Sequence, residues 1–117
     1  MVVFRGVREP IKVAWLAEPM VETLNLLGVW SARKGIDVTI HSMNDHTHKK
    51  DSLHGRDLAL DFKVDHQDPD AMDDCVNYLK QNLSLGFDIL WKTDAAHMNH
   101  CHVEFDVKQR RGAWQST

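Results

Sequence analysis

The sequence predicts an α+β domain with a small, mainly antiparallel sheet and helices packed on one face of it. Two segments repeat apolar residues at helical spacing, and four others alternate apolar with polar residues as half-buried strands do. Along the chain, the elements follow the order helix, strand, loop, strand, helix, strand, strand, which is typical of this fold class. We expect one domain over residues 1–117, with a flexible tail over residues 109–117.

The first half of the chain contains one predicted helix and two predicted strands. Residues 19–34 form the helix, since a proline is tolerated at its start and Gly35 can supply a left-handed stop. Alternation then predicts strands over residues 36–41 and 58–64. The polar segment 42–55 between them is interpreted as a long loop, and loops of this length are often functional.

The second half contains one predicted helix and two predicted strands. Asp68 is expected to cap the helix, because its side chain can accept hydrogen bonds from the first turn, and Gly86 is expected to end it. Two further alternating segments predict strands over residues 87–91 and 101–107, joined by a hairpin loop over residues 92–99.

Composition excludes several classes of partner. The 117 residues are 43% hydrophobic and 26% charged, with a formal net charge of -3, so no general attraction to nucleic acid is expected. The low positive charge also disfavours a metal-dependent nuclease, which needs a basic surface for phosphate.

The sequence also bears on location and on cysteine chemistry. No apolar run reaches the ~18 residues of a membrane span and no signal peptide is recognised, which predicts synthesis in the cytoplasm without membrane insertion. Cys75 and Cys101 are expected to be free thiols.

Histidine and carboxylate residues suggest a metal site. At the start of the last predicted strand and within it, His100, His102 and Glu104 share one face, and Asp61 points away from the apolar row of its own strand. If these two strands are neighbours, Asp61 and His102 converge, and the preceding loop can deliver His54. Two imidazoles and a carboxylate are a ligand set for catalytic Zn²⁺, which keeps a fourth position for water and lowers the pKa of that water.

Two segments carry a resemblance to a known family. Residues 52–62 resemble the Ser-x-His-x-x-Gly-x-Ala-x-Asp signature of the D-Ala-D-Ala carboxypeptidase family of zinc peptidases. Residues 100–105 resemble the His-x-His of the superfamily that unites lysostaphin-type enzymes, D-Ala-D-Ala peptidases and the hedgehog signalling domain. The resemblance covers about residues 36–106 and implies a hedgehog/D-Ala-D-Ala peptidase-like fold.

This resemblance implies a zinc metallopeptidase that cleaves a peptide bond in peptidoglycan stem peptides, with D-Ala-D-Ala carboxypeptidase-like or L-Ala-D-Glu endopeptidase-like specificity. Its zinc ligands would be His54, Asp61 and His102. Phage endolysins and virion-associated peptidases of this type are similarly short. The chain is therefore expected to be released at lysis or carried by a virion.

The resemblance also suggests residues that contact the substrate. Ser52 would orient a ligand or the loop, and His100 would stabilise the oxyanion or assist proton transfer. Lys49, Lys50 or Arg56 could hold the substrate carboxylate as charged hydrogen-bond donors. Glu104 lies on the same strand face and is a further candidate for substrate binding.

Two positions depart from the family pattern. Asp57 stands where the signature has glycine, and Asn99 stands where active relatives carry the glutamate or aspartate that acts as general base. Asparagine cannot accept the proton of water, so His100 is the first candidate to replace it. Other candidates are Asp94, His97 and Glu104. The alternative is a catalytically weak or inactive zinc-stabilised homologue that binds cell-wall peptide or a protein partner.

Overall fold

The computed structural model describes residues 1–5, 18–42, 59–65, 68–92 and 100–105. In these residues the elements are β1 (Val2–Phe4), α1 (Glu18–Lys34), β2 (Val38–Ser42), β3 (Ala59–Val64), α2 (Pro69–Asn82), β4 (Phe87–Leu90) and β5 (Cys101–Phe105). Every predicted helix and strand is present within a few residues of its expected bounds, and β1 is an additional strand. The expected tail and hairpin loop lie largely outside the described residues.

The strands form a five-stranded sheet in the order β1-β2-β3-β5-β4. β1 runs parallel to β2, whereas β2–β3, β3–β5 and β4–β5 are antiparallel. The prediction of a mainly antiparallel sheet is confirmed, although β1 makes the sheet mixed. Backbone hydrogen bonds hold β1 in place, including one of 2.8 Å from the N–H of Arg5 to the carbonyl of Ile40.

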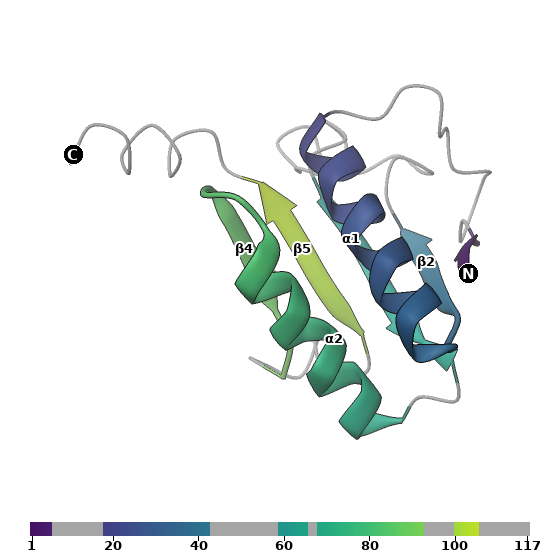
Figure 1. Cartoon of the computed structure of the whole chain (residues 1–117). Helices are drawn as coiled ribbons and strands as arrows, with labels where there is room; N and C mark the ends of the chain where they lie inside the picture. The colour runs from purple at the N-terminus through teal and green to yellow at the C-terminus, as the bar shows by residue number, and fades with distance from the viewer. Residues whose placement is uncertain (6–17, 43–58, 66–67, 93–99, 106–117) are drawn as a thin grey trace.

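Both helices lie on one face of the sheet, as the sequence predicts (Figure 1). Apolar side chains from the helices and from alternate strand positions meet between the two layers and form the core. Its fully buried members include Met20, Leu27, Trp30, Ile40, Leu60, Phe62, Leu79 and Val103. Because the helices cover this face, the intervening strand residues, which are more polar, lie on the opposite face of the sheet.

The helix ends follow the capping signals except at the end of α2. Asp68 caps α2 by accepting a hydrogen bond of 2.9 Å from the N–H of Asp70, and Gly35 follows α1 with a φ of 68°. The expected stop at Gly86 is wrong, because the helix ends at Asn82 and Leu83 is already extended. Gly86 instead adopts a φ of 100° in the turn before β4.

The early end of α2 has a tertiary cause. Ser84 donates hydrogen bonds of 2.7 Å from its N–H and 2.9 Å from its hydroxyl to the carboxylate of Glu22 on α1. This contact holds the chain against α1 in a conformation that a continued helix would not allow. No helix in the described part of the chain is long and apolar enough to cross a membrane.

Candidate metal-binding site

The pairing of β3 with β5 brings two of the three predicted metal ligands together. Asp61 and His102 are directly opposite each other in the antiparallel register. Their side chains touch, with 2.7 Å between Oδ1 of Asp61 and Nδ1 of His102. The two strands are therefore neighbours, which is the condition that the sequence analysis set for Asp61 and His102 to converge on the polar face.

Two further residues of the same face flank this pair. Nε2 of His100 lies 3.9 Å from Oδ1 of Asp61, and Nε2 of His102 lies 3.6 Å from Oε2 of Glu104. The Asp61 carboxylate therefore faces both histidines, and the His102 ring stands between two carboxylates. Glu104 is placed behind His102, where it can orient the imidazole.

His41 is a further histidine near this cluster, and the sequence analysis missed it. The register between β2 and β3 shifts between Ile40 and Ser42, so that Ser42 pairs with Asp61 and His41 occupies the irregularity. Such bulges commonly re-aim a side chain next to a functional site. The charges of Asp61 and His100 both influence the pKa of His41, which places it in their neighbourhood. The sequence feature that could have indicated His41 is its place at a polar position of an alternating strand.

His41 and His102 are both partly buried, and their pKa values are shifted in opposite directions. For His41, burial comes first, followed by the positive charge of Lys63, and together they lower the pKa below its usual value of 6.5. For His102, burial also acts to lower the pKa, but it is outweighed by the hydrogen bond to Asp61 and by the charges of Asp61 and Glu104, so the pKa is raised. His102 thus holds a proton at a pH where His41 has lost it.

The raised pKa of His102 sets how the site responds to pH. Without metal, the contribution of the Asp61–His102 pair to stability is complete below the ordinary pKa of 6.5, and it is lost as pH rises through the raised pKa of the folded state. Ligation of a metal by Nδ1 requires the proton on this atom to leave. Metal binding is therefore expected to strengthen as pH rises through the same range.

The donor set of the pair suits zinc, and its spacing is close to the one required. A tetrahedral zinc ion with bonds of ~2.0–2.1 Å holds its donor atoms ~3.3 Å apart, compared with 2.7 Å between Oδ1 and Nδ1 in the hydrogen-bonded pair. A small rotation of either side chain would open the required distance. Both side chains are largely buried, with exposed fractions of 19% for Asp61 and 13% for His102. The surrounding residues therefore leave each side chain few other conformations.

The described residues supply part of the predicted site. They contain no group of three or more histidine, cysteine, aspartate or glutamate side chains arranged to hold a metal ion. The predicted third ligand, His54, lies outside the described residues. The same is true of the other predicted site residues in the loops, which are Ser52, Arg56, Lys49, Lys50, Asp94, His97 and Asn99.

The two cysteines do not belong to a metal or nucleophile site. Both are free, as the sequence analysis expects, and both are buried. Burial raises the pKa of the Cys75 thiol to about 12 and raises that of Cys101 as well. Since the thiolate is the form that binds metals and attacks electrophiles, both side chains act as small apolar residues of the core.

Comparison with known proteins adds no relative: no protein-family model matches the chain, and no curated protein matches it.

Proposed function

We propose that the chain is a zinc-dependent metallopeptidase that cleaves a peptide bond in peptidoglycan stem peptides, with a hedgehog/D-Ala-D-Ala peptidase-like fold. The observation that carries this proposal is the 2.7 Å contact between Asp61 and His102 on neighbouring strands. These are the residues to which the two separate motifs of the sequence assign zinc ligation. Phage-encoded lysis or virion proteins provide the setting in which such a short peptidase would act.

In this proposal Asp61, His102 and the loop residue His54 hold the metal. A zinc ion at this position would polarise the scissile carbonyl and lower the pKa of a water molecule toward neutrality. Glu104 would accept a hydrogen bond from Nε2 of His102 and so keep Nδ1 directed at the metal, as outer carboxylates do for metal-bound histidines.

Proton transfer would fall to a histidine, because Asn99 cannot accept a proton. His100 is the first candidate, since its ring lies 3.9 Å from the Asp61 carboxylate and its side chain is 30% exposed. It is therefore close enough to the ligands to reach a substrate and open enough to exchange a proton with water. In the alternative role it would donate a hydrogen bond to the oxyanion.

A second candidate function is a zinc-stabilised module that binds cell-wall peptide or a protein partner without cutting it. Asn99 favours this function, because it removes the usual general base and leaves the proposed ligands intact. The two functions share the metal site and differ in turnover.

Digestion of purified peptidoglycan tests the proposal. The full chain is incubated with peptidoglycan in the presence of zinc, and the release of new amino termini or of D-alanine is measured with and without a chelator. We expect release that the chelator abolishes and added zinc restores, and no release with Asp61→Asn. Zinc binding without turnover would support the binding module, and absence of both would contradict both functions.

The orienting role of Glu104 gives a separate prediction. Glu104→Gln removes the negative charge beside Nε2 of His102, and we expect it to weaken zinc binding by about 10- to 100-fold. Asp88 is the cross-strand neighbour of Glu104 on β4, so Asp88→Asn removes the same charge one strand further from His102 and serves as the control. Zinc affinity is measured by competition with a chromogenic chelator. Equal weakening in both variants would mean that Glu104 affects zinc affinity only through its negative charge and not by orienting His102.

A further inference from the structure

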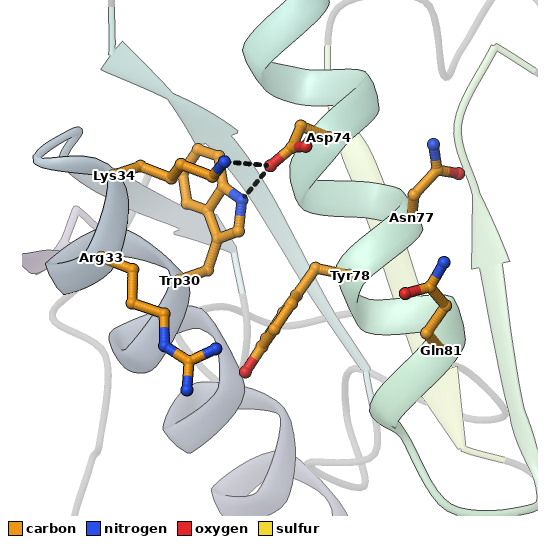
Figure 2. Close-up of a pocket in the computed structure, with 7 residues that line it drawn as sticks. All are labelled: Trp30, Arg33, Lys34, Asp74, Asn77, Tyr78 and Gln81. Atoms are coloured by element: carbon orange, nitrogen blue, oxygen red, sulfur yellow. Dashed lines mark hydrogen bonds and ion pairs between the residues drawn. The ribbon is translucent and has the colours of Figure 1, made fainter.

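A groove of about 460 Å³ lies between α1 and α2, on the helix side of the sheet (Figure 2). The last turns of α1 contribute Trp30, Arg33 and Lys34, which are spaced so that they share one helix face. One face of α2 contributes the opposite wall. The metal-binding residues lie on the other face of the sheet, so this groove is independent of them. Its volume falls in the range of ~300–1,000 Å³ that small-molecule sites occupy.

One end of the groove is closed by interactions within the protein. The indole Nε1–H of Trp30 donates a hydrogen bond of 2.7 Å to Oδ2 of Asp74, and Nζ of Lys34 lies 3.4 Å from the same oxygen. Among the described lining residues Asp74 alone carries a carboxylate, and it is paired with the Lys34 cation, while the buried indole has its partner. These residues have little left to offer a ligand.

The other end of the groove carries two hydrogen-bond donors, the Arg33 guanidinium and the Tyr78 hydroxyl. Within the described part of the chain, neither the Arg33 guanidinium nor the Tyr78 hydroxyl forms a hydrogen bond or ion pair. Figure 2 shows both groups extending toward the same end of the groove. The exposed side chains of Asn77 and Gln81 also line the groove from α2, and Figure 2 shows them on the side of α2 away from Arg33. Since Lys34 and Asp74 cancel, Arg33 gives the lining a net positive charge.

We propose that this groove binds a small organic anion, with its carboxylate or phosphate group held by Arg33 and Tyr78. Guanidinium groups bind both anions through two parallel hydrogen bonds, and a phenol hydroxyl adds a third donor. The body of the ligand lies along the half-buried ring of Tyr78, and a ligand that extends over α2 reaches the exposed amides of Asn77 and Gln81, which can donate and accept hydrogen bonds. This arrangement favours an organic anion over a free inorganic one.

Titration of the ¹⁵N-labelled full chain by NMR tests the site, with phenyl phosphate, benzoate and inorganic phosphate as separate probes. We expect saturable shifts of the Trp30 indole N–H and of the Asn77 and Gln81 side-chain amides with at least one organic probe, and weaker binding of inorganic phosphate. The tighter of the two organic probes identifies the anionic group. Unsaturable shifts spread over the exposed cations would overturn the proposal.

Single-residue variants distinguish anion binding in the groove from non-specific attraction of anions to positive side chains. Arg33→Gln keeps length and hydrogen-bonding capacity without the charge, and it should weaken binding of the tighter organic probe about tenfold. Tyr78→Phe should weaken it about threefold. Lys80 lies on α2 outside this groove, so Lys80→Gln should leave binding unchanged. Equal binding by Arg33→Gln and the unmodified chain would overturn the assignment.

Discussion

His102→Ala is expected to abolish zinc binding. The unmodified chain should hold about one zinc ion after dialysis, and the variant should hold almost none, because a catalytic zinc site needs three protein ligands and only two would remain. His54→Ala and Asp61→Asn should have the same effect, because each also removes one of the three proposed ligands. Metal content is measured by inductively coupled plasma mass spectrometry on dialysed protein.

The control for this prediction lies on the same strand face. His100 is two residues from His102 and its ring also approaches Asp61, at 3.9 Å, yet it is not assigned as a ligand. His100→Ala should therefore retain the zinc and lose activity on peptidoglycan. Circular dichroism of each metal-free variant distinguishes loss of a ligand from loss of the fold. Unchanged zinc content in folded His102→Ala would rule out the site as described.

Phe62→Ala is expected to cause the largest loss of stability. Phe62 is fully buried in β3, a central strand, where it is paired with Ile40 and Cys101 and covered by the helices. Removing a buried phenyl ring costs about 3–5 kcal/mol, through lost burial and the cavity left behind. A domain of this size is stable by about 5–15 kcal/mol, so the variant should lose a large part of its free energy of unfolding.

Urea unfolding followed by circular dichroism measures this loss, and Phe4→Ala is its matched control. Phe4 is the same residue type in the edge strand β1 and is 37% exposed, so its replacement should cost about 1 kcal/mol or less. If Phe62→Ala does not fold, the milder Phe62→Leu should show an intermediate loss. Similar losses for Phe4→Ala and Phe62→Ala would contradict the layered packing described above.

The helices could be predicted because their signals are local. Asp68 caps α2 through the N–H groups two and three residues further on, and Gly35 follows α1 directly. The end of α2 was predicted wrongly because it depends on a contact between Ser84 and Glu22, which are 62 residues apart. β1 was missed for a related reason. It is three residues long, and its place depends on parallel pairing with β2 rather than on a pattern of its own.

The candidate site was likewise predictable only where local sequence patterns determine it. Alternation in each strand was enough to place His100, His102 and Glu104 on one face, and Asp61 on the face opposite its apolar neighbours. Whether these faces met was a separate question, because periodicity within a strand carries no information about which strand lies beside it. The position of His41 depends further on a bulge in β2, which changes the register by one residue. The alternation of residues in β2 does not signal this bulge.

By itself, the amino-acid sequence determined the kind and approximate extent of most elements and the side of each strand that faces the helices. Both follow from interactions between residues close in the chain and from the need to bury apolar side chains. Only the tertiary structure decided that β3 lies between β2 and β5, so that Asp61 and His102, 41 residues apart, come within 2.7 Å. That order depends on how the whole core packs, since backbone hydrogen bonding alone would allow β3 to pair with other strands.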